Sequence, residues 1–168
     1  MTTLTVQQLQ LRLTNKILCQ DLSVEFHAGQ RWAILGMNGA GKTTLLHTLA
    51  GLHPPQHGTI QLNGKALSLW SPRALSQQLA FLFQDFSAPM GGRVLDYVLL
   101  GRHPHVPAWG WENADDFAIA YKALAHVDLT GLAERDITTL SGGERQRLAI
   151  ALVIAQQPEL FLLDEPVN

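Results

Sequence analysis

The stretch that decides the fold is Gly36-Met-Asn-Gly-Ala-Gly41-Lys42-Thr43, which has the spacing G-x-x-x-x-G-K-[ST]. An apolar run precedes this stretch and a segment with helical periodicity follows it, which is the strand–loop–helix context that the spacing requires. The glycines let successive backbone N–H groups point at one anion, and the start of the following helix adds partial positive charge. The stretch therefore predicts a phosphate-binding loop, and a plain glycine-rich turn with an exposed lysine is the disfavoured alternative.

The polar residues of this loop have roles that follow from their chemistry. Lys42 supplies a point charge for the β- and γ-phosphates of a nucleotide, and the Thr43 hydroxyl is a ligand for Mg²⁺. Asn38 and Gly39 supply turn conformations. The residues expected to bind the nucleotide are Gly36, Asn38, Gly39, Gly41, Lys42, Thr43 and Thr44.

Length, composition and charge exclude several other classes of protein. The 168 residues suffice for one average domain, and with 46% hydrophobic and 15% charged residues the composition is far from that of a disordered chain. The formal net charge of -2 argues against a basic nucleic-acid-binding surface, and the single cysteine, Cys19, excludes an internal disulfide framework and a Cys-rich zinc site. No segment reaches the roughly 20 apolar residues of a membrane span, so membrane association is expected only through a partner.

Strands and helices are expected around the loop from periodicity and turn signals. Alternating apolar residues predict a half-buried strand over 4–13 with a slip at Gln7-Gln8, and a second strand over 22–26. The apolar run 31–35 predicts a short strand, buried on both faces, that leads into the phosphate loop. The other expected elements are a helix over 43–50 ended by Gly51, a strand over 59–62 with a hairpin turn at Asn63-Gly64, a short helix from Ser71-Pro72, a strand over 79–83, helices within 93–127 with Asn113 as a cap, a helix over 141–157 and a strand over 160–163.

Two carboxylates follow the last apolar strand. Asp164 is expected in the coordination shell of Mg²⁺, through a water molecule, and Glu165 beside the attacking water as a general base or orienting group. An apolar strand followed by Asp-Glu is common, and taken alone it indicates only a strand that enters a solvated loop. The phosphate loop earlier in the same chain makes the functional interpretation the favoured one.

The segment Leu140-Ser-Gly-Gly-Glu-Arg-Gln-Arg147 has two compatible interpretations. In the first, Ser141 and Glu144 form a capping box that opens a helix. In the second, Ser141 with Gly142 and Gly143 offers donors to an anion at that helix start. The whole octamer is far more specific than the spacing Ser-x-x-Glu.

These motifs, in this order along the chain, resemble those of the ATP-binding subunit of ABC (ATP-binding cassette) transporters. The matching elements are the phosphate loop, Gln84 after an apolar strand, the signature segment 140–147 and Asp164-Glu165-Pro166. The resemblance implies an α/β fold of the P-loop NTPase class, ABC ATPase type, with an N-terminal antiparallel β portion. It implies one domain over 1–168, with an ATP-binding core at 1–86 and 148–168 and a helical subdomain at 87–147 that ends in the signature.

The same resemblance assigns roles to the motif residues. Two such domains dimerise head to tail, with ATP and Mg²⁺ between the phosphate loop of one and the signature of the other. Lys42 and Glu165 would therefore act in their own site, and Gln84 would be a catalytic and Mg²⁺-contacting residue that also senses a membrane subunit. A polar strand end is the alternative for Gln84. The residues expected to contact ATP across the dimer are Ser141, Gly142, Gly143 and Glu144, and the expected Mg²⁺ ligands are Thr43, Gln84 and Asp164.

The segment Val98-Leu-Leu-Gly-Arg-His-Pro-His105 looks like one found in importers of metal chelates, namely iron–siderophore complexes, haem and cobalamin. The resemblance thus implies an ATPase that powers an importer from the cytoplasmic face of the inner membrane. Its partners would be a second copy of itself, permease subunits that the start of the helical subdomain contacts and, indirectly, a substrate-binding protein, with no nucleic acid. For His103 and His105, surface histidines near the docking face are favoured over a metal site.

Two other functions remain open at this point, a nucleotide-binding fragment without turnover and a soluble ABC-type protein that acts on nucleic acid or ribosomes. The chain departs from the family in two places. Leu13 stands where an aromatic residue usually stacks on adenine, and no histidine follows Glu165 to act as a switch. The sequence is therefore expected to be a truncated ABC ATPase that lacks the last strands of the fold, including the one between 31–35 and 160–163.

Overall fold

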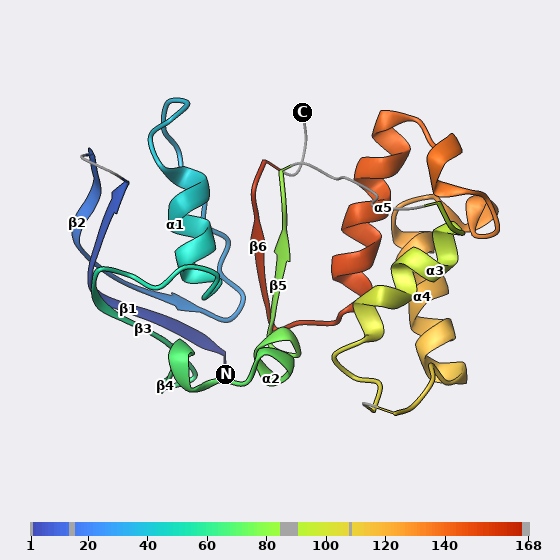
Figure 1. The fold of residues 1–168 in the computed structure, drawn as a ribbon, viewed down its shortest axis with the longest axis horizontal. Helices are drawn as coiled ribbons and strands as arrows, with labels where there is room; N and C mark the ends of the chain where they lie inside the picture. Colours follow the sequence, from blue (N-terminus) through green and yellow to red (C-terminus); the bar gives the residue numbers. More distant parts are fainter. Residues whose placement is uncertain (1, 14–15, 85–90, 108, 166–168) are drawn as a thin grey trace. The chain divides into compact units, whose positions relative to one another are not determined.

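The computed structural model describes residues 2–13, 16–84, 91–107 and 109–165, and it divides into two compact units, Met1–Leu75 and Ser76–Asn168. Each unit is described by itself (Figure 1). No helix within the described residues is long and apolar enough to cross a membrane.

The first unit is built on an antiparallel sheet. Its strands are β1 (Thr3–Leu13), β2 (Lys16–His27), β3 (His57–Leu62) and β4 (Lys65–Ala66), in the spatial order β2-β1-β3-β4. Alternate side chains turn inward, as the sequence pattern predicts, because successive residues of a strand face opposite sides. The buried residues of this unit include Leu4, Val6, Leu9, Leu11, Leu46, Leu49, Ile60 and Leu62. The structure therefore contains the expected antiparallel N-terminal portion.

Local turn and bulge signals in this sheet are confirmed. The slip expected at Gln7-Gln8 is an irregularity in the pairing of β1 with β2, and Gln8 has a φ of 50°. Gly58 lies opposite the slip, where a Cβ would collide with the backbone of both glutamines. Asn63 and Gly64, with φ of 53° and 75°, form the hairpin turn between β3 and β4, as this dipeptide predicts.

The strand expected over 31–35 is wrong. Residues 31–37 have no regular structure, and the side chain of Leu35 is 90% exposed. Trp32 instead packs edge-on against Phe26 of β2, with ring centroids 5.2 Å apart, and its indole N–H donates to the Gln30 side chain. A short apolar run forms a buried strand only where neighbouring strands take its backbone hydrogen bonds, and no described strand pairs with this run.

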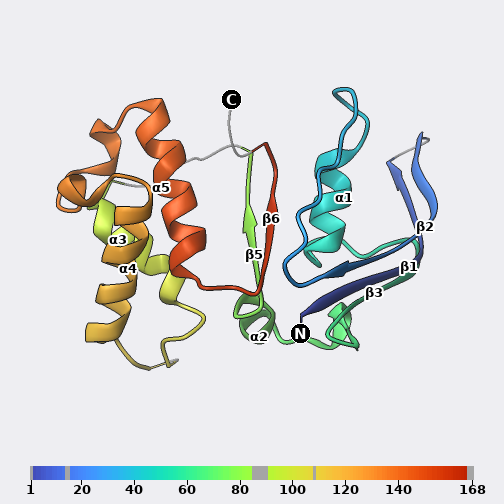
Figure 2. The same cartoon turned by 180° about the vertical axis from the view of Figure 1, so that it is seen from behind.

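The second unit contains a two-stranded parallel sheet. Strands β5 (Leu79–Leu82) and β6 (Leu160–Leu163) pair in register and lie side by side in both views (Figures 1 and 2). Helix α5 (Gly142–Ala155) packs on them, with Ala80 and Leu82 in one cluster with Ala149 and Val153. The carboxyl ends of both strands therefore lie at the same edge, which brings Gln84 and Glu165 close together.

Helices make up the rest of the second unit. Beside α5 lie α3 (Val94–Leu99) and α4 (Ala114–His126), joined by the single turns η2 (Leu100–Arg102), η3 (Thr130–Leu132) and η4 (Ile137–Thr139). Along the chain, β4 is followed by the short elements η1 (Leu67–Leu69) and α2 (Pro72–Ser76). Asn113 caps α4 in a capping box, as the sequence predicts.

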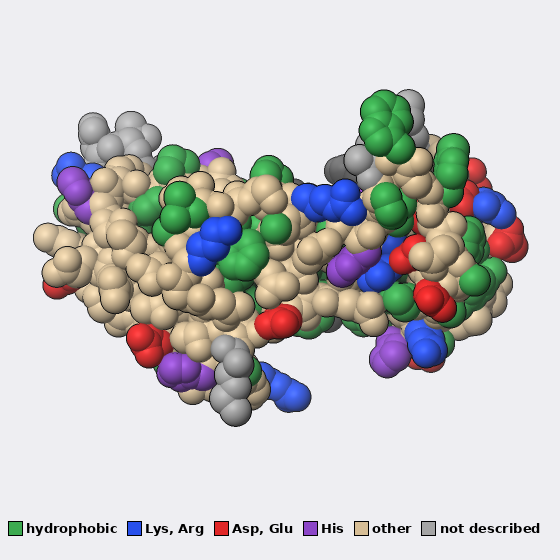
Figure 3. Space-filling view, turned by 90° about the horizontal axis from the view of Figure 1, so that it is seen from below, with side chains coloured by type: hydrophobic (Ala, Val, Ile, Leu, Met, Phe, Trp, Pro, Cys, Tyr) green, Lys and Arg blue, Asp and Glu red, His purple; other side chains and the backbone are tan. Residues whose placement is uncertain are grey.

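Large hydrophobic side chains also remain at the surface of the described chain. Figure 3 shows hydrophobic side chains, in green, distributed over one face. Over the described residues, the most exposed large hydrophobic side chains are Leu35, Met37, Leu69, Trp109 and Trp111. Hydrophobic side chains that are exposed singly are common on protein surfaces, so by themselves they mark no partner site.

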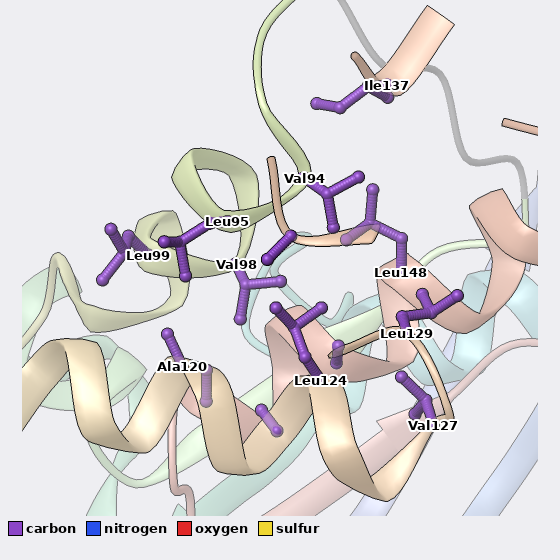
Figure 4. Close-up of a cluster of buried hydrophobic side chains, with 14 of the residues drawn as sticks. Val94, Leu95, Val98, Leu99, Ala120, Leu124, Val127, Leu129, Ile137 and Leu148 are labelled. Carbon is purple, nitrogen blue, oxygen red and sulfur yellow. The ribbon is translucent and has the colours of Figure 1, made fainter. Parts of the chain in front are cut away.

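The three helices share one apolar core, which Figure 4 shows with its side chains pointing toward one another. Members of this core that are hardly exposed at all are Val94, Val98, Ala120, Leu124, Leu129, Leu148, Ala151 and Ala155. The core explains why Val94–Leu99 and Ala114–His126 are helical and why α5 returns to pack beside them.

One ion pair lies inside this unit. Arg102 of η2 donates from Nε to Asp116 Oδ1 of α4 at 2.9 Å, and both side chains are only 7% exposed. Asp116 also accepts the backbone N–H of Asn113. Burial opposes ionisation of Asp116, but these hydrogen bonds outweigh it, so the pKa of its carboxyl lies below the usual range. The pair therefore stays charged and links η2 to the start of α4.

The substitution Asp116→Asn tests this link. It leaves the buried guanidinium of Arg102 without its counter-charge, so the free energy of unfolding is expected to fall by about 3 kcal/mol. Asp115→Asn is the matched control, because Asp115 is the exposed neighbour in the same helical turn, and its loss is expected to cost less than about 1 kcal/mol. Urea unfolding measures both, and equal losses would contradict the role given to the pair.

Acid is expected to remove the same contribution. Because the pKa of Asp116 is lowered by folding, its contribution to stability is present above its ordinary pKa of about 4 and is lost as the pH falls through the folded value. The difference in unfolding free energy between the wild type and Asp116→Asn should therefore shrink as the pH is taken below about 4. A difference that stays constant down to about pH 2 would argue against a charged Asp116.

Candidate functional site

The phosphate loop has the backbone form that its glycines predict. Gly39 and Gly41 have φ of 73° and 99°, in the region that favours glycine over other residues. Gly41 is the N-cap of α1 (Lys42–Leu49), and a Cβ there would also press on the Leu18 side chain. The loop therefore turns directly into the helix start.

At the start of α1, no residue of the helix offsets the positive end of the helix dipole. Gly41 supplies no side-chain hydrogen bond to the first turn of the helix, and that turn contains no acidic residue. The first N–H groups of a helix have no partner within the helix and attract anions. An anion at this end would therefore accept hydrogen bonds from backbone N–H groups that no capping side chain uses.

Lys42 folds back along the loop that precedes it. Its Nζ donates to the carbonyl oxygens of Gly36 and Met37 at 3.0 and 3.2 Å. The N–H of Ala40 donates to Met37 O at 3.1 Å and closes the turn between them. The ammonium group is thus held over the loop by neutral acceptors, which a phosphate oxygen can replace with a stronger, charged one.

The far end of α1 is closed by a glycine, as predicted. Gly51 has a φ of 75°, and its N–H donates to Thr48 O at 3.0 Å. The N–H of Leu52 donates to His47 O at 2.9 Å, which completes a Schellman motif. With Leu46 and Leu49 buried, this end fixes the helix that carries the phosphate loop.

In the second unit, Gln84 and Glu165 lie together beyond the ends of β5 and β6. The Gln84 amide Nε2 donates to Glu165 Oε2 at 2.7 Å. Asp164 is 3% exposed, and its N–H donates to Leu82 O at 3.0 Å, so the strand pairing continues up to the carboxylates. Glu165 has a φ of 45°, a conformation that few residues other than glycine adopt and that is found often at functional sites.

The signature segment opens α5 with a complete capping box. Ser141 Oγ accepts the N–H of Glu144 at 3.3 Å, and Glu144 Oε2 accepts the N–H of Ser141 at 2.7 Å. These hydrogen bonds lower the pKa of Glu144. The first interpretation of the segment is therefore confirmed, while Gly142 and Gly143 lie exposed beside the cap.

The structure brings some predicted site residues together and leaves others in separate units. Gln84, Asp164 and Glu165 share one strand edge, but the phosphate loop belongs to the other unit. Leu13, which stands where an aromatic residue usually stacks on adenine, has a side chain outside the described part of the chain. The predicted motif residue Pro166 also lies outside it.

The two histidines of the segment 98–105 have separate contacts. His105 Nε2 lies 2.9 Å from Gln156 O, and His103 lies 4.0 Å from the Glu112 carboxylate. Within the described residues, no group of three or more His, Cys, Asp or Glu side chains could hold a metal ion.

Sequence reasoning missed the contacts of Arg102. This residue was treated only as part of a family-like segment, yet its guanidinium reaches Asp116 and the end of α5 at Ala155 and Gln157. The signal that could have indicated it is an arginine in an otherwise apolar helical stretch, because a buried arginine requires a carboxylate partner.

Comparison with known proteins places these motifs in a family. The family model described as "ABC transporter" matches residues 19–168. The iron(3+)-hydroxamate import ATP-binding protein FhuC of Bacillus subtilis is 37% identical over 168 residues, which are 100% of this chain and 62% of that protein. The molybdate import ATP-binding protein MolC of Haemophilus influenzae is 40% identical over 151 residues, 90% of this chain and 54% of that protein.

A solved structure agrees with this comparison. A chain described as a metal-chelate type ABC transporter in an inward-facing conformation superposes with a TM-score of 0.81 at 37% identity, over 98% of this chain and 60% of that one. The present chain spans about three fifths of the length of the curated relatives that it matches. The fold is thus that of an ABC ATPase, and the chain belongs to the ABC transporter family.

Proposed function

We propose that this chain binds ATP and that the full-length protein hydrolyses it to power a membrane importer of metal chelates, such as iron–siderophore complexes, haem or cobalamin. The observation that carries the proposal is the loop 36–43, where two left-handed glycines open α1 with no side-chain cap. This backbone arrangement supports a phosphate site. Membership of the ABC transporter family supports ATP as the nucleotide.

In the proposed complex, the phosphates lie against the N–H groups of the loop. Lys42 exchanges the carbonyl oxygens of Gly36 and Met37 for oxygens of the β- and γ-phosphates. Because phosphate oxygens are charged, the new hydrogen bonds are stronger than the ones that they replace. The other residues proposed to contact ATP are Gly36, Asn38, Gly39, Gly41, Thr43 and Thr44.

The proposed Mg²⁺ ligands are oxygen donors, which this ion prefers. They are the Thr43 hydroxyl, the Gln84 amide oxygen and, through water, the Asp164 carboxylate. The Gln84 amide nitrogen donates to Glu165, and the amide oxygen is the atom that we propose binds the cation. Mg²⁺, when bound, neutralises charge on the phosphate oxygens.

We assign hydrolysis to Glu165, positioned by Gln84. The carboxylate already accepts a hydrogen bond from the Gln84 amide, so it is held in one orientation before substrate arrives. In the proposed complex, this carboxylate accepts a proton from, or orients, the water that attacks the γ-phosphate. Its left-handed backbone supports a functional rather than a purely structural role.

The proposed assembly contains a second copy of the protein and membrane permease subunits, and indirectly a substrate-binding protein. In it, Ser141, Gly142, Gly143 and Glu144 contact the ATP of the partner subunit. The exposure of both glycines at the start of α5 supports this. The protein would then act at the cytoplasmic face of the inner membrane, with 87–147 as its helical subdomain.

The names of the relatives support import more firmly than any one cargo. Besides the iron(3+)-hydroxamate and molybdate proteins, relatives that match this chain are named for import of hemin and of cobalamin. We place the cargo among metal chelates because the segment 98–105 looks like that of such importers. Uptake assays with these chelates in a strain that lacks the full-length gene would test the cargo.

Lys42→Ala tests the nucleotide site. Removal of the ammonium group takes away charge-assisted hydrogen bonds worth about 2 kcal/mol, so the affinity for ATP is expected to fall by roughly 30-fold. Lys65→Ala is the matched control, because Lys65 is an exposed lysine of the same unit that lies over the Trp70 ring. Calorimetric titration of Mg²⁺-ATP measures both affinities, and an unchanged affinity of the Lys42 variant would refute the assignment.

Glu165→Gln tests the step of hydrolysis in the full-length protein. Loss of the carboxylate is expected to lower the turnover number by about 100-fold or more, with ATP affinity nearly unchanged. Glu25→Gln, an exposed carboxylate on β2, serves as the control and should retain full turnover. Phosphate release measures the rates. If the wild type binds ATP without releasing phosphate, the protein is a nucleotide-binding module without turnover and the proposed hydrolysis is wrong.

A further inference from the structure

The C-terminal end of α5 is held by side chains from another segment. The last four carbonyl groups of a helix have no partner within it, and at a buried end they need partners from elsewhere. Ala155 O accepts from Arg102 Nη1 at 2.8 Å, and Gln156 O lies 2.9 Å from His105 Nε2. The residues around η2 therefore close this helix end.

Arg102 is itself fixed on its other sides. Its Nε donates to Asp116 Oδ1 at 2.9 Å, and its Nη1 also donates to Gln157 Oε1 at 3.1 Å. The guanidinium thus joins three parts of the unit, namely η2, the first turn of α4 and the end of α5. A rigid planar fork of this kind fixes direction as well as distance, which a lysine cannot do.

The same helix end is tied to the start of β5. Gln156 Nε2 donates to Ser76 O at 2.5 Å and to Leu79 O at 2.9 Å. Gln77 Nε2 donates to Pro104 O at 2.6 Å, so the segment after η2 is tied there as well. Because these contacts are directional hydrogen bonds, they set the position of α5 along its own axis, which apolar packing alone leaves loosely defined.

Gly101 shows how close η2 lies to α5. A Cβ on this residue would collide with the carbonyl oxygen of Leu152 and lie 3.2 Å from the backbone nitrogen of Gln156. Only glycine permits this approach, and it lets the neighbouring Arg102 reach past the last turn of the helix. The approach and the guanidinium contacts therefore form one clamp, which we define as Gly101, Arg102, His105 and Gln156.

The clamp lies at one end of α5, and the signature lies at the other. The helix has 14 residues, so its two ends are about 20 Å apart. A tilt of about 5° at the clamp would move the opposite end by about 2 Å. Misplacement of a group by about 1 Å can lower a reaction rate by about 100-fold. The orientation at the clamp therefore matters for any contact made by Ser141, Gly142 or Gly143.

We propose that Arg102 is a positioning residue for ATP hydrolysis. Through the clamp it sets the place of Ser141, Gly142 and Gly143, which lie about 20 Å away at the start of α5. This inference rests on the proposed function, in which those residues contact the ATP of the partner subunit. It adds a role for the segment 98–105 that lies inside the protein, in which the half-buried His105 takes part and the exposed His103 does not.

The double substitution Arg102→Met/Asp116→Leu tests the proposal in the full-length protein. It replaces the buried pair by apolar side chains, which commonly preserves stability, but it removes the hydrogen bonds to Ala155 and Gln157. We expect a nearly unchanged ATP affinity, because the phosphate loop is untouched. The urea midpoint should fall only in part, because the Ala155 carbonyl loses its partner but no buried charge is left unpaired. The turnover number of this double variant should fall at least 10-fold. Of the two single variants at this position, Arg102→Lys should retain more turnover than Arg102→Met.

Two further variants keep the test decisive. Arg93→Met removes an exposed arginine that pairs with Asp96 and Glu134 without contact to the clamp, and it should keep full turnover. If the double variant fails to fold, His105→Ala/Gln157→Ala removes the contact of His105 with Gln156 and the contact of Gln157 with Arg102, without leaving a buried charge unpaired. It should lower turnover about 3-fold or more at unchanged ATP affinity.

The outcomes separate this inference from the proposed function. Full turnover in a folded clamp variant would overturn the positioning role while leaving the ATPase proposal intact. A loss of turnover that merely follows the folded fraction would also overturn it, because it would show a structural role alone. A wild-type protein without ATP hydrolysis would instead contradict the proposed function.

Discussion

Backbone hydrogen bonding is the constraint on which the rest of the structure depends, because a buried N–H or C=O group without a partner is costly. Strand β6 forms because β5 lies beside it in register. The run 31–35 is as apolar as a strand, but no described strand pairs with it and it stays irregular. The end of α5 is buried because Arg102 and His105 reach its last carbonyls. Elements form where their backbone groups find partners.

The sequence predicts best the features that depend on neighbouring residues. The caps at Asn113 and Ser141, the turn at Asn63-Gly64 and the helix stop at Gly51 are confirmed, because each depends on side-chain chemistry within a few residues. The spacing of the phosphate loop likewise predicts its left-handed glycines and the helix that follows. Such local signals are sufficient to assign most helices and the antiparallel sheet.

Features that depend on distant contacts are harder to predict. The hydrogen bond between Gln84 and Glu165 joins residues that are 81 apart in the chain, and only the parallel pairing of β5 and β6 brings them together. The partners of Arg102 lie on two other segments, so a local pattern shows a polar residue without its role. The strand predicted over 31–35 is wrong for the same reason, since an apolar run predicts burial but does not predict which strand will pair with it.

The two helix starts of the candidate site differ in a way that fits different tasks. At α1, Gly41 leaves the first N–H groups without a side-chain cap, whereas Ser141 and Glu144 cap α5. An uncapped start with no acidic residue offers the stronger anion site, and a capped one is better suited to hold its own geometry. The central claim is therefore that the phosphate groups of ATP bind at the start of α1. Amide hydrogen exchange of the full-length protein with and without Mg²⁺-ATP tests it most directly. The account predicts slower exchange across 36–44 when ATP is present, and unchanged exchange in that segment at saturating ATP would contradict it.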